Sequence, residues 1–281
     1  MYQASTISIE DCIIRRGFDF DLLNPVALPQ TPGMDVVGHI IELPRCCRTR
    51  NTTRWSLGDR VAALVRTGGN ARYCCAHIDA LVSVPTQGLD AAEAVALVSN
   101  YTTAYQALKR IRQEGSVFSM LGKRVLIVGG MDGPGQALIQ MCSKARATVY
   151  ATGPVHRHTY IHNILGAKAL PEVGWLTSEV QASMDYVFDG VCEDGLEISH
   201  KALKEKTGEL VCFGHTAMLR EREMGILGAP ASAYINKLRS QLYPHADLDI
   251  WQSYNNDPDT YKVRRNKQPH GSLNSSFCRK T

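Results

Sequence analysis

The chain has 281 residues, 44% of them hydrophobic, and a formal net charge of +4 at pH 7. This length and composition are typical of a globular protein with one large or two medium domains, and no apolar run reaches the roughly 18 residues that would span a bilayer. The N-terminus has no basic segment followed by an apolar core, so we expect a cytoplasmic protein with no membrane partner.

The positive charge is concentrated at the C-terminus. Residues 262–281 contain six basic and no acidic residues, so the remaining 261 residues carry a formal charge of −2. Basic tails can bind nucleic acid or acidic lipid, but this chain has no zinc finger and no basic stripe interleaved with aromatic residues. We therefore interpret residues 263–281 as a disordered basic tail and expect no nucleic-acid partner.

The nine cysteines predict neither a disulfide framework nor a structural zinc site. Their number is odd, four of them form the adjacent pairs Cys46–Cys47 and Cys74–Cys75, and no C-x-x-C spacing occurs. Disulfide scaffolds and zinc ribbons depend on spacings that this chain lacks. Most of the cysteines are expected to be small core residues.

Short apolar segments separated by glycine and proline predict a small β-domain in the first hundred residues. A turn at Thr31-Pro32-Gly33 precedes the first clear strand. The expected strands are residues 36–43, 61–65, 72–76 and 81–84. Strands this short and closely spaced are typical of a small or partly open barrel.

The pattern becomes helical at Asp90, which is expected as an N-cap with Glu93 completing a capping box. A second helix is expected over residues 102–112. Farther along, strands alternate with helices, and this alternation predicts an α/β fold with a parallel, doubly wound sheet. The expected strands are 125–128, 148–152, 186–189 and 209–213, the expected helices are 134–144, 158–165, 196–203 and 231–242, and an apolar turn is expected at 167–171.

The stretch from Arg124 to Thr152 is the most informative part of the sequence. It reads RVLIVGGMDGPGQALIQMCSKARATVYAT, a strand that runs into a glycine-rich turn, then a helix and a second strand. This is half of a mononucleotide-binding βαβ unit. Such a turn directs backbone N–H groups and the positive end of a helix toward a phosphate.

The order of several blocks along the chain resembles the medium-chain dehydrogenase/reductase superfamily. The blocks are PGMDVVGHIIEL, LGDRVAAL, GGNARYCCAHIDALVSVP, LDAAEAVALVSNYTTAYQAL and GKRVLIVGG. Each block is weak alone, but their ordered series is specific. The similarity covers roughly residues 4–262 and looks most like the zinc-independent quinone oxidoreductase and enoyl reductase branch.

The resemblance implies a fold, a domain organisation and an activity. It implies a partial GroES-like β-domain over residues 1–98 and a Rossmann-type nucleotide-binding domain over residues 99–262. Members of the branch use NADPH to deliver hydride to a carbon–carbon double bond conjugated with a carbonyl. The implied substrate is a small-molecule enone, quinone or enoyl thioester, in the enoyl case within polyketide or other secondary metabolism and beside a synthase partner. Homodimers are common among the relatives.

The positions that would bind zinc carry other residues. Zinc-dependent relatives have a cysteine in the block that matches residues 5–11 and a His-Glu pair at the block PGMD. This chain has Ser8 at the first position and Met34-Asp35 at the second. Because neither Ser8 nor Met34 is a competent zinc ligand, no catalytic metal is expected.

The end of the second strand of the βαβ unit indicates the type of cofactor. A carboxylate there would hold the ribose hydroxyls of NAD and repel a 2′-phosphate. This chain offers Thr152, Gly153, His156 and Arg157 instead, and a guanidinium can pair with a phosphate through a forked contact. We therefore expect NADP(H); the alternative is that His156 and Arg157 lie in a solvated loop.

The glycine-rich turn departs from the family pattern G-x-G-x-x-G, because it reads GMDGPG over residues 130–135. Gly130, Gly133 and Gly135 keep the shape of a dinucleotide turn. Asp132 replaces the middle glycine with a bulkier, negative residue, and Pro134 suits a helix start but removes an N–H donor. Two interpretations stay open: Asp132 caps the helix and occupies the anion site from within, or the turn still binds a cofactor phosphate.

The resemblance places further candidates near the nicotinamide. Asn100, Tyr101 and Thr103 lie at the start of the linking helix, and Tyr101 is the candidate proton donor to a developing enolate oxygen. The alternative for all three is ordinary packing between domains. Gly214 lies at the carboxyl end of the last recognised strand, where ligands bind in open sheets, and His215 is a weaker candidate for an acid.

The family has further strands before the block at residues 5–11 and further segments after residues 257–262. The resemblance therefore implies a chain that is truncated at both ends, with unpaired sheet edges. Two functions stay open. The first is an NADPH-dependent reductase of an activated C=C bond, and the alternative is a truncated, non-catalytic remnant with weak or no nucleotide binding.

Overall fold

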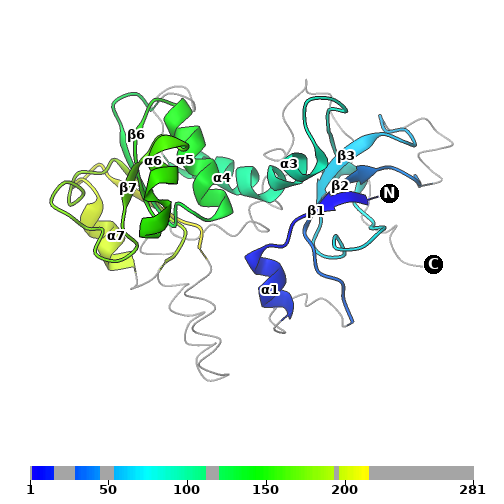
Figure 1. The fold of residues 1–281 in the computed structure, drawn as a ribbon, viewed down its shortest axis with the longest axis horizontal. Helices are drawn as coiled ribbons and strands as arrows, with labels where there is room; N and C mark the ends of the chain where they lie inside the picture. Colours follow the sequence, from blue (N-terminus) through cyan, green and yellow to red (C-terminus); the bar gives the residue numbers. More distant parts are fainter. Residues whose placement is uncertain (1, 16–28, 45–53, 112–119, 193–195, 215–281) are drawn as a thin grey trace.

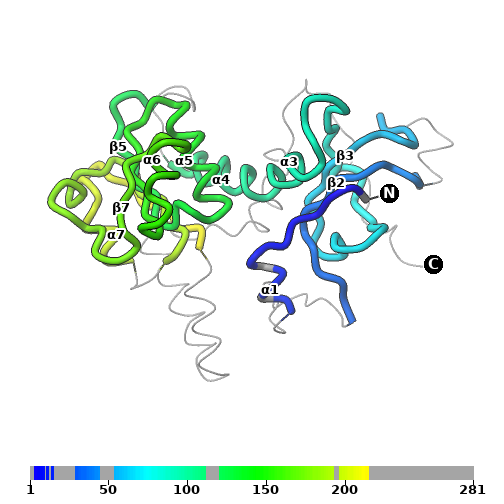
Figure 2. Tube along the Cα trace, in the orientation of Figure 1, coloured from blue at the N-terminus to red at the C-terminus, as the bar shows by residue number. Residues whose placement is uncertain are grey.

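The computed structural model describes residues 2–15, 29–44, 54–111, 120–192 and 196–214 of the chain. They form two lobes, each with its own sheet, which are joined by the helices α3 (Ala91–Ala96) and α4 (Val98–Arg110) (Figure 1). Figure 2 follows the chain from the antiparallel lobe, in blue and cyan, through these helices to the parallel lobe, in green and yellow. No helix in the described ranges is long and apolar enough to cross a membrane.

The antiparallel lobe is a four-stranded sheet in the order β1-β2-β3-β4. Its strands are β1 (Tyr2–Ser5), β2 (Asp35–His39), β3 (Arg60–Leu64) and β4 (Val82–Ser83), with the helix α1 (Ile9–Arg15) after β1 and the short helix η1 (Ile78–Ala80) before β4. Alternate residues of β2 face opposite sides: Val37 packs with α3 and α4, while Val36 packs with Trp55 on the other face. This is the period-2 burial of a sheet covered on both faces, and it fits the GroES-like β-domain that the resemblance implies.

The expected strand at residues 72–76 is wrong, because this segment has irregular backbone in which residues 72–75 are exposed and only Ala76 is half-buried. The preceding residues are bonded elsewhere: the amides of Gly68, Gly69 and Asn70 donate to the carbonyls of residues 31–33. These bonds turn the chain away from the sheet. With no face to bury, the alternating pattern alone does not make a strand.

The linking helices begin with the expected cap. Asp90 Oδ1 accepts the Glu93 amide at 2.7 Å and Glu93 Oε2 accepts the Asp90 amide at 3.1 Å, which confirms the capping box of α3. The second helix, α4, starts four residues earlier than expected. Leu97, the C-cap residue of α3, has right-handed helical backbone and lets the next helix start at once.

The parallel lobe is a five-stranded, wholly parallel sheet in the order β7-β6-β5-β8-β9. Its strands are β5 (Arg124–Val128), β6 (Thr148–Thr152), β7 (Lys168–Leu170), β8 (Tyr186–Asp189) and β9 (Glu209–Cys212). Its helices are α5 (Gly133–Lys144), η2 (Val155–Arg157), α6 (His158–Asn163) and α7 (Glu197–Ala202). α4, α5 and α6 cover one face and α7 the other, which confirms the expected Rossmann-type doubly wound sheet (Figure 1).

The apolar turn expected at residues 167–171 is wrong, since Lys168–Leu170 form the edge strand β7. They pair in parallel with Tyr150, Ala151 and Thr152 of β6. A run of three residues is too short to show strand periodicity, and the neighbouring strand that supplies its hydrogen bonds is not visible in the sequence.

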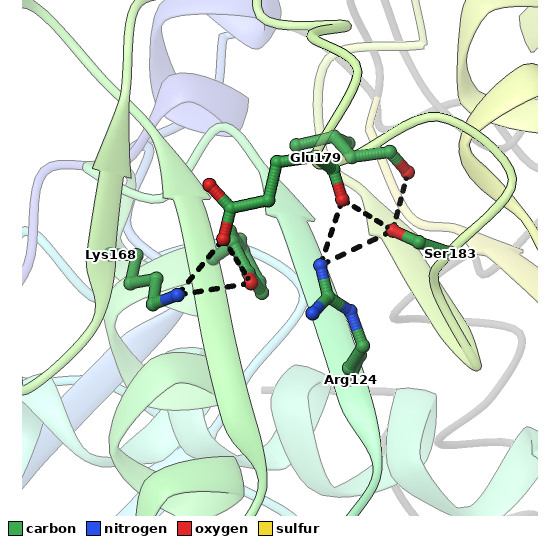
Figure 3. A network of polar contacts seen from close by, with 6 residues as sticks. Arg124, Lys168, Glu179 and Ser183 are labelled. Atoms are coloured by element: carbon green, nitrogen blue, oxygen red, sulfur yellow. Dashed lines mark hydrogen bonds and ion pairs between the residues drawn. The ribbon is translucent and has the colours of Figure 1, made fainter.

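Side chains of the parallel lobe form a polar network around β5, β6 and β7 (Figure 3). Lys168 Nζ donates to Glu179 Oε1 at 2.9 Å, and the Tyr150 hydroxyl donates to the same oxygen at 2.7 Å. Arg124 Nη2 donates to the Glu179 carbonyl at 2.8 Å, and its guanidinium lies 4.8 Å from the centre of the Tyr150 ring. All strands of this sheet begin at one side, which we call the amino edge, and end at the opposite side, the carboxyl edge. Arg124 and Lys168 begin their strands. We therefore call the following residues the amino-edge network: Arg124, Tyr150, Lys168, Glu179 and Ser183.

Three expectations lie outside the described residues. These are the helix at residues 231–242, the disordered basic tail at residues 263–281 and the candidate acid His215.

Candidate functional site

The candidate site lies where the chain leaves the adjacent strands β5 and β8. After β5 the chain continues into α5 on one face of the sheet, whereas after β8 it leads to α7 on the opposite face. The strand order therefore reverses between β5 and β8. Ligands of open parallel sheets bind at such a point, beyond the carboxyl ends of the strands.

The turn after β5 is fixed to the neighbouring strand by Thr152. The Gly130 amide donates to the Thr152 carbonyl at 2.9 Å, and the Gly129 amide donates to the Thr152 hydroxyl at 2.9 Å. Thr152 is 2% exposed, so its side chain holds the turn and is not a surface contact. Gly129 has φ +84°, a conformation that side chains rarely adopt.

Gly129 is a candidate site residue that the sequence analysis missed. The family pattern G-x-G-x-x-G starts at Gly130, whereas the residue with the left-handed backbone is Gly129, one position earlier. The signal was the Gly129-Gly130 doublet directly after a buried strand, because consecutive glycines at such a place often mark an unusual backbone turn.

Two further glycines are required by close approach. A Cβ atom on Gly135 would lie 2.1 Å from the Gly129 carbonyl oxygen, so α5 packs on the turn at a distance that only glycine permits. A Cβ atom on Gly133 would lie 2.3 Å from Asn100 Oδ1. The side chain of Asn100, from α4, therefore rests on the first residue of α5.

The start of α5 presents backbone donors at this point. Gln136 is bonded through its amide to the Asp132 carbonyl at 2.9 Å, whereas the helical positions before it have no acceptor inside the helix. Pro134 has no N–H, which leaves the amides of Gly133 and Gly135 as the donors of this first turn. The helix dipole adds a partial positive charge there.

Asp132 occupies the N-cap position of α5, as one interpretation expects, with extended backbone at φ −72° and ψ 161°. Its side chain makes no capping hydrogen bond to the helix, however, and the residue is exposed. The carboxylate therefore does not satisfy the helix amides in the way a capping side chain would. It places a negative charge beside the phosphate position that the turn would offer.

Of the three candidates in α4, the structure brings Asn100 to the turn. The Tyr101 hydroxyl donates to Gln140 Oε1 in α5 at 2.8 Å, and burial raises the pKa of this phenol although that hydrogen bond opposes the shift. The Thr103 hydroxyl donates to the Ser99 carbonyl at 2.8 Å, and Thr103 is buried. Tyr101 and Thr103 thus lie in the packing of α4 on its neighbours.

The loop after β6 carries the candidate phosphate ligands. His156 and Arg157 belong to η2 and are both exposed. Gly153 is enclosed, since a Cβ there would lie 2.8 Å from Ile161 and 2.9 Å from Met131. His158 Nε2 lies 3.0 Å from the Gly153 carbonyl oxygen and fixes the loop. Arg157 is therefore on the surface of a loop that starts beside the turn.

The ends of β8 and β9 close the other side of the site. Asp189 is buried, and its carboxylate accepts the amides of Val191 and Cys192 and the hydroxyl of Ser199. These bonds turn the chain at the end of β8. A Cβ on Gly214 would lie 2.0 Å from the Gly190 carbonyl oxygen, so the ends of the two strands are in close contact.

The positions that hold zinc in other relatives are occupied by a hydrogen-bonded corner. The Ser8 hydroxyl donates to Asp11 Oδ2 at 3.1 Å, and Asp11 Oδ1 accepts the Gly33 amide at 2.6 Å. Met34 is buried. Within the described ranges, no three His, Cys, Asp or Glu residues are grouped closely enough to hold a metal ion.

A separate open hollow of about 610 Å³ lies at the β7 edge, lined in part by His158, His162, Lys168 and Glu179. It is not at the carboxyl ends of β5 and β8. Its two opposite charges, Lys168 and Glu179, are paired with each other at 2.9 Å. We therefore assign the candidate site to the glycine turn.

No family model matches the chain, but solved structures are similar to it, among them the following three. A probable oxidoreductase from Mycobacterium abscessus is 27% identical with a TM-score of 0.60, over 75% of this chain and 64% of that one. The quinone oxidoreductase from Thermus thermophilus, solved alone and with NADPH, is 26% identical with a TM-score of 0.58, over 77% and 63%. CurK enoyl reductase, at 19% identity and a TM-score of 0.68 over 92% and 74%, shows the fold alone.

The chain thus spans less than two thirds of the length of the first two of these proteins. The likenesses agree with the Rossmann-type sheet, the antiparallel lobe and the order of sequence blocks. The two structures at 26–27% identity confirm the resemblance stated from the sequence, the second of them being a quinone oxidoreductase, and CurK enoyl reductase confirms the fold.

Proposed function

We propose that this chain, a protein of the medium-chain dehydrogenase/reductase type by its fold, is an NADPH-dependent reductase of an activated C=C bond. The observation that supports the proposal is the turn after β5, with its left-handed Gly129, its closely packed Gly135 and the exposed first residue of α5. The substrate class would be an enone, a quinone or an enoyl thioester. The similarity to the quinone oxidoreductase from Thermus thermophilus supports the same activity.

The residues at the site fit a dinucleotide phosphate in three respects. The amides of Gly133 and Gly135 are donors at a helix N-terminus, which is a common anion site. No side chain fits on Gly135, so the turn and the helix stay in close contact. β6 ends in Thr152 rather than in a carboxylate, and Arg157 is exposed directly before α6. A 2′-phosphate would pair with Arg157, with His156 beside it.

The chain's own residues would orient the reactants. NADPH, when bound, supplies the hydride. Asn100, which rests on Gly133, is the side chain of α4 placed to fix the cofactor beside the turn. Tyr101 could serve as proton donor only after its hydroxyl leaves Gln140, so we propose Asn100 as the more direct participant of the two.

The cofactor proposal is tested by titration of NADPH and NADH, with nucleotide fluorescence as the readout. We expect saturable binding of NADPH and weaker binding of NADH. Arg157→Ala should raise the Kd of NADPH by about tenfold, the effect of losing roughly 1.4 kcal/mol of a charge-assisted contact, and should leave the Kd of NADH unchanged. Failure to bind NADPH at millimolar concentration would refute the enzyme assignment.

The reaction is tested by oxidation of NADPH in the presence of a simple quinone or a conjugated enone. The product should be the saturated ketone from the enone or the hydroquinone from the quinone, with one NADPH and one proton consumed per molecule reduced. Binding of NADPH without turnover of either acceptor class would contradict the proposed reaction but not the cofactor.

A second candidate function is supported by Asp132. Its carboxylate replaces the middle glycine of the turn, is exposed and does not cap the helix. The carboxylate would repel a cofactor phosphate bound at the turn, because both are negatively charged. The alternative is therefore a protein with the reductase fold that binds nucleotide weakly and does not catalyse. The same NADPH titration distinguishes the two.

A further inference from the structure

Asp35, the first residue of β2, is the most deeply buried charged residue among the described residues of the antiparallel lobe. It is 1% exposed. Its Oδ2 atom accepts hydrogen bonds from the Thr6 hydroxyl and from the Ser99 hydroxyl, both at 2.7 Å. Burying a carboxylate is costly unless such bonds compensate it. Asp35 therefore joins β2 to the segment after β1 on one side and to α4 on the other.

The residue after Ser99 is the one that contacts the glycine turn. Asn100 donates from Nδ2 to the Ala96 carbonyl at 2.9 Å, and its Oδ1 atom lies against Gly133. Successive residues of a helix point about 100° apart. One turn of α4 is thus held by the antiparallel lobe through Ser99 and meets the start of α5 through Asn100.

α4 is suited to transmit such a constraint. It contacts β2 and β3 of the antiparallel lobe and packs along α5 in the parallel lobe. In Figure 1 it lies between the two sheets. A rotation of its first turn about the helix axis would move Asn100 across Gly133, and the Ser99–Asp35 bond opposes that rotation.

We propose that Asp35 is a positioning residue for the dinucleotide turn, acting through Ser99 to hold the Asn100 amide over Gly133. This inference rests on the proposed function, since it assigns to Asp35 a part in binding NADPH. Asp35 does not itself reach the turn. It sets the orientation of the helix whose next side chain does.

Thr6 supplies a matched control for Ser99. Both hydroxyls donate to the same oxygen at the same distance, but Thr6 lies outside α4. If Asp35 only stabilises the fold, Thr6→Ala and Ser99→Ala should have the same effects. If it positions the turn, only Ser99→Ala should weaken cofactor binding.

The experiment measures the Kd of NADPH and the unfolding midpoint for Ser99→Ala, Thr6→Ala and Ser99→Thr. We expect Ser99→Ala to raise the Kd at least about fivefold, the lower end of typical coupling between sites. Thr6→Ala should leave the Kd within about twofold of the wild-type value, and Ser99→Thr should restore binding because it keeps the hydroxyl. An equal rise in Kd for Ser99→Ala and Thr6→Ala, or no rise for Ser99→Ala, would overturn the proposal.

A second readout works without cofactor and separates this inference from the proposed function. Amide hydrogen exchange of the full chain should become faster at residues 98–101 and 129–136 in Ser99→Ala, but not in Thr6→Ala. If wild-type protein fails to bind NADPH while this difference in exchange is present, the proposed function is wrong, but the role of Asp35 in positioning the turn is still supported. Unchanged exchange at residues 129–136 in Ser99→Ala would contradict that role.

Discussion

The two edges of the parallel sheet are built from different chemistry. At the amino edge, Arg124, Lys168 and Glu179 are bonded to one another or to nearby backbone (Figure 3). At the carboxyl edge, glycines bring backbones together and the turn after β5 ends in two helix amides, those of Gly133 and Gly135. Polar side chains therefore bond to each other or to nearby backbone at one edge, while backbone donors are presented at the other.

In this protein the shifted pKa values of the network lie away from the candidate site. The pKa of Lys168 is raised by its bonds to Glu179 and Tyr150, and the pKa of Glu179 is lowered by its bonds to Lys168 and Tyr150. Shifted pKa values are often taken as a sign of an active site. Here they arise from an ion pair within a structural network, whereas the candidate site depends on backbone geometry that titration does not reveal.

The largest effect is expected from Gly135→Ala at the carboxyl edge. The new Cβ would lie 2.1 Å from the Gly129 carbonyl oxygen, so the turn or α5 must move. We expect a loss of about 3 kcal/mol in the free energy of unfolding, the upper range for overpacking, together with loss of NADPH binding. Urea unfolding and nucleotide titration measure both.

Gly166→Ala is the control for this variant. Gly166 lies in the same lobe with φ +73°, and nothing lies within 4 Å of its missing Cβ. Only the left-handed backbone is strained, which costs about 1 kcal/mol, and NADPH binding should be unchanged. Equal losses in the two variants would show that close packing at Gly135 is not what the turn requires.

The next effect is expected from Asp185→Ala at the amino edge. Asp185 accepts the Arg124 amide, and both of its oxygens accept from Lys204 Nζ at 2.9 Å. The side chain is 12% exposed, and bonds to charged groups of this kind contribute about 2 kcal/mol after allowance for solvent. We expect that loss in urea unfolding at pH 7, with an unchanged Kd for NADPH. A changed Kd would show that the amino edge also affects binding of NADPH at the carboxyl edge.

The same variant has a defined pH dependence. Burial alone would raise the pKa of Asp185, but the Arg124 amide and Lys204 outweigh it and hold the pKa below its usual value. A lowered folded-state pKa means that the stabilisation is present above the ordinary carboxyl pKa and is lost as the pH falls through the folded value. The stability difference between wild type and Asp185→Ala should therefore shrink as the pH falls below about 4.

A smaller effect is expected from Asp132→Gly, which removes the charge beside the phosphate position. A like charge near the surface costs roughly 1 kcal/mol, so the Kd of NADPH should fall about fivefold at low salt. The gain should shrink at about 1 M salt because of screening. Asp132→Asn separates charge from size. If its Kd for NADPH equals that of Asp132→Gly, the charge of Asp132 weakens binding. If it keeps the wild-type Kd while Asp132→Gly lowers it, the size of the side chain weakens binding. An unchanged Kd in both variants would show that the turn is not limited by this residue.

Much of the fold could be predicted because it depends on local patterns. The capping box at Asp90 and the buried strand at Tyr186–Asp189 follow from residues close in the sequence, and both were predicted at the right positions. The predictions for residues 72–76 and for β7 were wrong because their state depends on partners far along the chain. Hydrogen bonds to residues 31–33 decide the first, and pairing with β6 decides the second.

The candidate site was predictable in its place but not in its details. The glycine turn is visible in the sequence, and so is its position between a strand and a helix. The contact of Asn100 with Gly133, the bond of Tyr101 to Gln140 and the bonds of Asp35 are tertiary, so no spacing reveals them. Asp132 shows the limit most clearly, since a residue type that commonly caps helices stands at the N-cap position here and makes no capping bond.

The smallest effect is expected from Lys168→Met in the amino-edge network. Lys168 and Glu179 are more than half exposed, and exposed ion pairs often contribute nothing measurable to stability. The methionine can still pack its chain along the Tyr150 ring, and the Tyr150 hydroxyl keeps its bond to Glu179. We therefore expect the urea midpoint and the Kd of NADPH to stay at their wild-type values. A clear loss of stability would mean that the exposed part of the network holds the β7 edge, and that Asp185 is not the main polar anchor of this side of the sheet.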